Sequence, residues 1–226
     1  MHPLDNVVWH ALTGPHETVA EAYGDGARRY PSNMAHFAAI PDEPDARAWA
    51  DLASMSTSPV LLFRAKVPSP PHGWSVVMQL PTLQMVPPAA LETAPDAPIV
   101  PLEVADVPAM VELVVRTAPG PFMERTHEMG AYFGIKERGR LVAMAGERMR
   151  LDGFSEVSAV CTDPEYRGRG YAAALVHRVV SHARAGGGDA FLHVLVKNTS
   201  AIRVYEFLGW TVRTEIDAQV LAYSES

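Results

Sequence analysis

The stretch DPEYRGRGYAAALVHRVV, residues 163–180, places a glycine-rich turn directly before an apolar run with helical periodicity. Glycine weakens a helix start, so two glycines at this point need a reason other than helix stability. The first four N–H groups of a helix have no partner within it, and the aligned peptide dipoles leave partial positive charge there. Glycine lets an anion approach these donors, and Arg167 and Arg169 add two cations. The stretch therefore predicts a pyrophosphate site.

A solvated turn before a glycine-softened helix is the competing interpretation of RGRG alone. The spacing does not match the G-x-G-x-x-G dinucleotide fingerprint, and the loop lacks the Gly-Lys-Ser/Thr of nucleoside triphosphate sites. However, the loop follows a predicted strand at 156–162, EVSAVCT, and open α/β sheets bind ligands at the carboxyl ends of their strands. The surrounding sequence has to decide between the two interpretations.

The second half of the chain alternates strand and helix patterns. Asp106 is a candidate N-cap, and three glycines at 186–188 end the helix predicted over 171–185. The order is strand-helix-strand-strand-strand-helix-strand-helix-strand, which indicates one sheet whose helices separate its strands. The segments are 99–117 (strand then helix), 131–151 (hairpin), 156–162 (strand), 171–185 (helix), 191–196 (strand), 198–210 (helix) and 211–223 (strand).

The first half carries less readable patterns. Residues 86–101, VPPAALETAPDAPIVP, favour neither helix nor sheet and are typical of a linker, so we expect a boundary near residue 97. Before it we expect a helix within 17–30 that breaks at Gly24, a second helix over 42–55, and strands at 59–67 and 74–86, the latter interrupted by Pro81.

The glycine loop and the segments after it resemble the GNAT superfamily of acyl-CoA-dependent N-acyltransferases. Members carry Gln/Arg-x-x-Gly-x-Gly/Ala at this point, and RGRGYA, residues 167–172, matches every fixed position. The resemblance covers residues 98–226, and residues 156–172 look most similar to the C-terminal domain of glycine N-acyltransferase-like proteins. A second block, Asn-x-x-Ala-x-x-x-Tyr-x-x-x-Gly-aromatic, is matched by Asn198, Ala201, Tyr205, Gly209 and Trp210.

The resemblance implies an α/β (α+β) fold of GNAT type, with a mixed central sheet flanked by helices. It also implies two units: a degenerate GNAT-like accessory domain at 1–97 and the N-acetyltransferase domain at 98–226. Acetyl-CoA is then the co-substrate. The implied cofactor-binding residues are Val160, Cys161, Thr162, Arg167, Gly168, Arg169, Gly170, Tyr171, Ala172, Ala173, Asn198 and Ala201.

Within that set the backbone carries most of the expected contacts. N–H groups from Gly168 to Ala173 hold the pyrophosphate, and the strand at 160–162 pairs with the pantetheine arm as an added strand does. The family resemblance implies that this strand splays from the next one, leaving a wedge for the thioester. An N–H near Val160 then polarises the thioester carbonyl.

The catalytic roles are implied by position. Tyr205 lies where family members often place the general acid that protonates the departing sulfur, and a locally satisfied buried tyrosine is the alternative. Glu147 and Glu156 are the candidate general bases, with a water chain or no dedicated base as the remaining possibility. His193 is either a proton carrier or a satisfied core residue, and Cys161 is expected to be a small buried apolar side chain.

Composition excludes several function classes. The net charge of −7 argues against a nucleic-acid binder, and the nine histidines show no ligand spacing, so we expect no metal. A single cysteine rules out an internal disulfide, and neither a leader peptide nor a membrane-length apolar run is visible. We expect a cytoplasmic monomer or homodimer.

Together these features predict an N-acyltransferase that moves an acyl group, most simply acetyl, from acyl-CoA to a primary amine by direct attack. The acceptor is a small-molecule amine or amino acid whose identity no motif reveals. The alternative is a catalytically silent acyl-CoA-binding sensor or interaction module that has kept the loop and lost turnover.

Overall fold

The structure, a computed structural model, describes residues 2–55, 59–91 and 96–224. Within these residues, twelve strands are linked in the order β1-β2-β3-β4-β12-β6-β11-β10-β9-β8-β7, with β5 also paired to β12. The strands are β1 Glu21–Tyr23, β2 Ala27–Arg29, β3 Phe37–Ala39, β4 Val60–Arg64, β5 Trp74–Gln79, β6 Thr82–Val86, β7 Ile99–Leu102, β8 Tyr132–Glu137, β9 Arg140–Leu151, β10 Phe154–Thr162, β11 Asp189–Leu195 and β12 Thr211–Tyr223. The helices are α1 Val7–Leu12, α2 Ala46–Ser54, α3 Val107–Thr117, α4 Tyr171–Ala185 and α5 Thr199–Phe207, with short 3₁₀ turns η1 Pro3–Asp5, η2 Glu17–Val19, η3 Val104–Asp106, η4 Thr126–Met129 and η5 Pro164–Tyr166.

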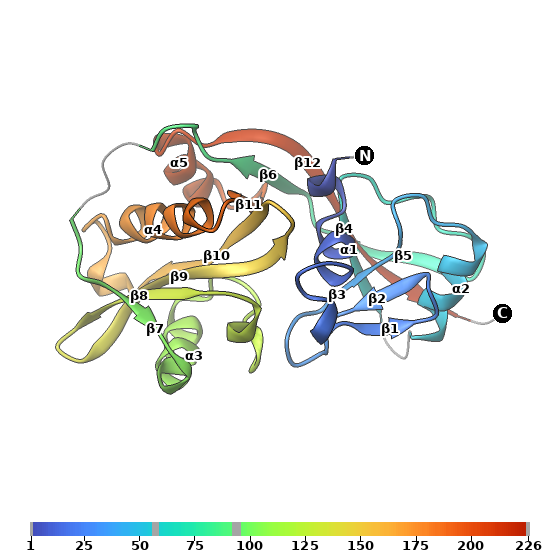
Figure 1. Cartoon of the computed structure of the whole chain (residues 1–226), viewed down its shortest axis with the longest axis horizontal. Coiled ribbons are helices and arrows are strands. Elements are labelled where there is room, and N and C mark those ends of the chain that lie inside the picture. Colours follow the sequence, from blue (N-terminus) through green and yellow to red (C-terminus); the bar gives the residue numbers. More distant parts are fainter. Residues whose placement is uncertain (1, 56–58, 92–95, 225–226) are drawn as a thin grey trace.

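The second half folds in the predicted element order, as a mixed sheet with helices on both faces (Figure 1). α4 covers one face, where Val176, Val179 and Val180 pack against apolar side chains of β8, β9 and β11. α3 covers the other face through Met110 and Leu113. The longest helix, α4, has 15 residues, and no helix in the described ranges is long and apolar enough to cross a bilayer.

The two halves share strands. β6, from the first half, lies between β11 and β12 and pairs antiparallel with both. β12 continues past β6 and pairs with β4 and β5, so it runs through both parts of the sheet (Figure 1). The division at residue 97 stays a prediction. The expected linker partly lies outside the described residues, at 92–95.

One prediction for the first half is wrong. The segment 17–30 forms η2 followed by the hairpin of β1 and β2, not a helix. The turn between the strands contains Gly24 at φ 54°, a left-handed conformation that suits a tight hairpin turn and ends any helix. The N–H of Gly26 donates to Asp51 of α2, which fixes this turn against the helix behind it. The predicted helix over 42–55 and the strands around Pro81 are confirmed.

α1, which the sequence patterns did not reveal, lies between the two halves (Figure 1). Its buried side chains join one apolar cluster with Met149 and Leu151 of β9 and Phe191 of β11. A core that crosses from one half to the other leaves them little freedom to separate, since burial of this kind is the main stabilising contribution. The first half therefore forms a wall beside the second half's sheet.

Candidate active site

A wedge opens between β10 and β11, as the resemblance implied. The two strands pair in parallel from Phe154–Asp189 to Val157–Leu192 and no further. Beyond that point β11 stays paired with β6, while β10 from Ser158 onward pairs with β9 on its other side. The edge of β10 that faces the wedge is therefore open to an extended ligand over the predicted positions 160–162.

A β-bulge lies at the start of this open edge. The register between β10 and β9 shifts between Ser158 and Cys161, and Ala159 adopts φ 52°. Alanine rarely takes this left-handed conformation, which costs on the order of 1 kcal/mol, and such strain is concentrated at functional sites. A bulge re-aims the backbone, here immediately before Val160, whose N–H was the predicted donor to the thioester. Nothing in the sequence indicates this bulge.

The glycine loop lies at the start of α4, where the sequence predicts an anion cradle. Gly170 is the N-cap at φ 77°, and no side chain caps the helix, so the N–H groups of its first turn have no helical partner. Gly168 also has φ 77°, and a β-carbon built there meets no atom within 4 Å. The loop from Arg167 to Gly170 is exposed. These open donors fit the phosphate groups of coenzyme A.

Several side chains around the glycine loop already make contacts within the protein. Arg169 lies over the ring of Tyr166 at 4.8 Å, and Arg167 Nε donates to the Thr162 carbonyl at 3.4 Å. The hydroxyl of Tyr171 donates to Oε1 of Glu137, the last residue of β8, at 2.6 Å, which ties the helix start to the neighbouring hairpin. The hydroxyl of Thr162 is buried with no partner among the described residues.

Asp163, which directly follows β10, connects the glycine loop to α3 and β9. Its Oδ2 accepts hydrogen bonds from Arg116 Nε at 3.0 Å and Arg140 Nη2 at 2.8 Å, and its Oδ1 accepts from the N–H of Glu165. Burial alone would raise the pKa of this carboxyl, but the Glu165 N–H and the two guanidinium groups outweigh it and lower the pKa. The arginines come from α3 and β9, so sequence spacing gave no sign of this anchor.

The second family block lies on α5 as predicted. Asn198 is the N-cap of this helix, and its side-chain oxygen accepts from the N–H of Ala201 at 3.2 Å. Tyr205 is 9% exposed and packs against Trp210, and burial raises its pKa to about 12. Because of this raised pKa the hydroxyl is protonated at neutral pH. It makes no hydrogen bond within the described residues, so it is free to donate.

The two candidate bases lie in different environments. Glu147 is 3% exposed on the α4 face; its Oε2 accepts from the N–H of Ala131 at 3.1 Å and lies 3.9 Å from His182. Glu156 is 1% exposed on the opposite face and accepts two hydrogen bonds from Arg148, at 2.8 and 2.6 Å. It also bonds His193 Nδ1 at 2.8 Å. Glu147 and Glu156 are therefore not brought together.

Glu156 is held as an anion. Burial would raise its pKa, but Arg148 and His193 outweigh burial and hold the pKa at about 2. His193 is buried too, and burial lowers its pKa despite the adjacent carboxylate. Its Nε2 lies 3.0 Å from Gln84 Nε2, whose amide oxygen accepts from Arg213. His193 is thus the satisfied buried residue of the two alternatives.

Cys161 is free, buried and packed with the α3-side cluster, as predicted. Burial raises the pKa of its thiol to about 11, so it is a poor nucleophile. Within the described ranges, no three His, Cys, Asp or Glu side chains are grouped to hold a metal ion.

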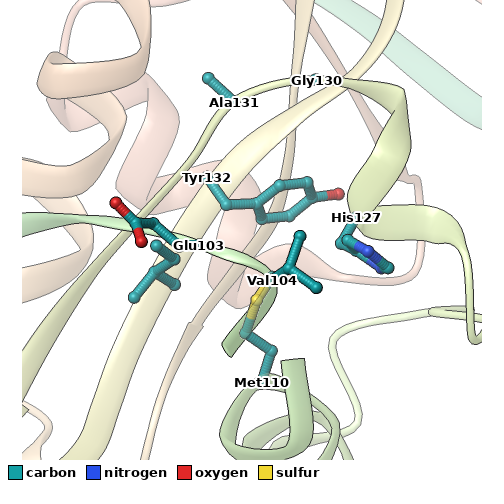
Figure 2. A pocket seen from close by; sticks show the side chains of 8 residues that line it. Glu103, Val104, Met110, His127, Gly130, Ala131 and Tyr132 are labelled. Atoms are coloured by element: carbon teal, nitrogen blue, oxygen red, sulfur yellow. The ribbon is translucent and has the colours of Figure 1, made fainter. Parts of the chain in front are cut away.

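A cavity of about 320 Å³ lies on the α3 side of the sheet, two strands from the wedge. Figure 2 shows the ring of Tyr132 crossing it beside Val104, with Met110 below and His127 at the far side. The Tyr132 hydroxyl is buried and has no partner among the described residues. The lining residues are Leu102, Glu103, Val104, Met110, His127, Gly130, Ala131 and Tyr132.

Comparison with known proteins agrees with this geometry. The family model described as FR47-like protein matches residues 132–218. A solved structure of a GNAT-family protein from Novosphingobium aromaticivorans DSM 12444 is 39% identical, with a TM-score of 0.87 and full coverage of both chains. The [Ribosomal protein bS18]-alanine N-acetyltransferase of Escherichia coli K12 is 28% identical over 119 residues, 50% of this chain and 80% of that one.

A second relative matches over a shorter stretch. The mycothiol acetyltransferase of Thermobispora bispora is 46% identical over 59 residues, 26% of this chain and 20% of that one.

The mixed α/β fold, the open edge of β10 and the uncapped start of α4 are the features expected of an acyltransferase. The chain belongs to the GNAT family of acetyltransferases. It is an acyl-CoA-dependent N-acyltransferase, and the family's co-substrate is acetyl-CoA.

Proposed function

We propose that this protein transfers the acetyl group of acetyl-CoA directly to a primary amine, without a covalent enzyme intermediate. The single observation that carries the proposal is the continuity of the bulged open edge of β10 with the uncapped start of α4. An extended thioester that pairs with this edge places its diphosphate at the cradle and its sulfur toward the apex of the wedge. All the predicted cofactor residues except Asn198 and Ala201 lie along this line.

The proposed chemical step uses a backbone N–H at the bulge of β10 and the hydroxyl of Tyr205 on α5. The amine nitrogen attacks the carbonyl carbon, and the N–H near Val160 stabilises the developing oxyanion. The C–S bond then breaks, and Tyr205 gives its proton to the departing thiolate. The proton lost by the amine passes through water to the general base and from there to the phenolate, so the enzyme ends the cycle unchanged.

The general base follows from the two carboxylates. Glu156, with a pKa of about 2 and both oxygens occupied, takes up an ammonium proton poorly, so we assign it a positioning role toward Arg148 and His193. Glu147 keeps one oxygen without a hydrogen bond to described residues, but it lies on the α4 face. We assign it the base role through water, and Glu147→Gln tests this: kcat should fall while coenzyme A affinity stays unchanged.

The acceptor class comes from the relatives. One acetylates the alanine of a ribosomal protein and another takes part in mycothiol acetylation, as their names state. A primary amine as acceptor agrees with the alanine N-acetyltransferase and with the glycine N-acyltransferase likeness, which stays a prediction. Cytoplasmic location and a monomeric or homodimeric state are likewise proposals.

The test is a thiol-release assay with acetyl-CoA across small amines, amino acids, amino-acid amides and peptide N-termini. We expect release that depends on at least one amine and yields the N-acetylated product by mass spectrometry. Tight coenzyme A binding with no transfer to any acceptor in the panel would contradict the proposal and indicate the silent binding module instead.

A further inference from the structure

A small cavity lies where the first half of the chain meets the loop after α3. Its volume is about 70 Å³. One wall comes from the first half, the other comes from the loop after α3, and Arg148 of β9 contributes a charged group. The lining residues are Met34, Ala35, His36, Phe37, Leu61, Pro121, Met123, Thr126 and Arg148.

Arg148 lines this cavity and has one guanidinium nitrogen, Nη1, that makes no hydrogen bond with the described residues. Its Nε and Nη2 are held by Glu156 at 2.8 and 2.6 Å, and its guanidinium lies over the ring of Phe37 at 4.9 Å. Nη1 makes no hydrogen bond within the described part of the chain, and the side chain is 15% exposed. The bidentate pair fixes the direction of Nη1, since the guanidinium is planar and rigid.

The cavity is linked to the apex of the wedge by the Arg148–Glu156 ion pair. Glu156 immediately precedes Val157, the last residue of β10 that pairs with β11. Val157 packs with the α4 cluster, whereas Glu156 and Arg148 point to the other face, because neighbouring strand residues alternate. α4 covers the first face, so an amine reaches the thioester from the face that Arg148 lines, and only water links it to Glu147 on the α4 face.

The charges around Arg148 favour a neutral oxygen of the acceptor as its hydrogen-bond partner. Arg148 and Glu156 neutralise each other, and burial lowers the pKa of His193 beside them. The free N–H therefore offers a strong hydrogen bond with little net charge, which suits a carbonyl oxygen better than a carboxylate. The remaining lining is mostly apolar and small, which fits a short side chain.

We propose that this cavity holds the acceptor and that Arg148 Nη1 donates to a carbonyl oxygen on the carbon next to the reacting amine. The preferred acceptors are then α-amino amides with small side chains, the chemistry of a peptide N-terminus. This inference rests on the proposed function and assigns the walls contributed by the first half a role in acceptor specificity.

The test compares alaninamide with sec-butylamine, which has a similar branched body and no oxygen. Arg148→Lys keeps a charge beside Glu156 but removes the rigid fork. We expect kcat/KM for alaninamide to fall about tenfold or more and that for sec-butylamine to change less than about twofold, with coenzyme A affinity unchanged. Arg150→Lys, an exposed arginine of the same strand, is the matched control and should change neither value.

A second variant leaves the Arg148–Glu156 ion pair intact. Ala35→Leu narrows the cavity from the first half, and we expect the KM for alaninamide to rise while the KM for acetyl-CoA stays the same. Equal losses for both amines in Arg148→Lys, or an unchanged alaninamide KM in Ala35→Leu, would overturn the inference and leave the proposed function standing. A wild-type protein that acetylates no amine would overturn both.

Discussion

The ring of Tyr132 lies against the bare backbone of Gly146, its partner across β8 and β9: a β-carbon at Gly146 would stand 2.3 Å from Tyr132 Cδ1. Only glycine leaves room for the ring, which spreads across β9 on the face that α3 covers. This contact fixes one wall of the larger cavity and couples two positions of the sheet that sequence spacing does not connect.

Gly146→Ala is expected to destabilise the protein by about 1–3 kcal/mol, because the added methyl group forces the buried ring of Tyr132 out of its rotamer. Denaturant unfolding of the variant measures the loss. The double variant Gly146→Ala with Tyr132→Ala should show strong coupling between the two sites. Additive losses would mean that the ring is free to move aside.

Tyr132→Phe is expected to leave stability unchanged or raise it by about 1 kcal/mol, because the buried hydroxyl has no partner among the described residues. Thermal unfolding followed by circular dichroism provides the measurement. Tyr205→Phe, which removes a hydroxyl to which we assign a catalytic role, is the comparison for thermal stability. A clear loss of stability in Tyr132→Phe would show that the hydroxyl is satisfied in solution.

His16 makes stability depend on pH. It is 4% exposed with its Nδ1 at 2.8 Å from the Tyr30 hydroxyl, and burial, with Arg150 adding to it, lowers its pKa from 6.5 to about 4. His16 therefore becomes protonated below pH 6.5 in the unfolded chain, but only near pH 4 in the folded chain. Stability is complete above pH 6.5 and falls by roughly 3 kcal/mol as the pH drops to about 4.

Urea unfolding between pH 7 and pH 4 checks this dependence. His16→Gln should flatten the slope across that window, whereas His72→Gln, an exposed histidine, should leave it as in the wild type. A wild-type slope that persists in His16→Gln would assign the effect to other groups, among them the buried His193.

Tyr205→Phe is expected to lower kcat by about 10²–10⁴-fold with little change in coenzyme A affinity, since it removes the proposed proton donor but keeps the packing against Trp210. Single-turnover kinetics and calorimetry separate the two quantities. Unchanged turnover would remove the general-acid assignment, and a parallel loss of affinity would point to a binding role.

The sequence predicted the elements whose signals are local. α4 spans Tyr171–Ala185 as expected because an apolar stripe, a preceding glycine loop and a following glycine run all agree. The helix expected within 17–30 failed because a Gly-containing turn and pairing with β3 outweighed the helical pattern. Both outcomes depend on whether neighbours in sequence or distant strands decide the backbone.

The candidate site was predictable only where a motif is contiguous. The cradle residues followed from RGRGYA, whereas the Arg148–Glu156–His193 contacts join three strands and depend on how β9, β10 and β11 stack. The bulge at Ala159 requires a backbone conformation that its residue type disfavours. β6 pairing between β11 and β12 likewise depends on folding of the whole chain.

Coenzyme A affinity, measured by isothermal titration calorimetry in two matched glycine variants, tests most directly whether main-chain donors at the start of α4 hold the diphosphate. Gly170 and Gly153 have φ angles of 77° and 78°, so valine strains both backbones similarly, and only Gly170 lies at the cradle. The wild type and Gly153→Val should bind coenzyme A alike, and Gly170→Val should bind at least about tenfold more weakly. Wild-type affinity in a folded Gly170→Val protein would contradict the cradle.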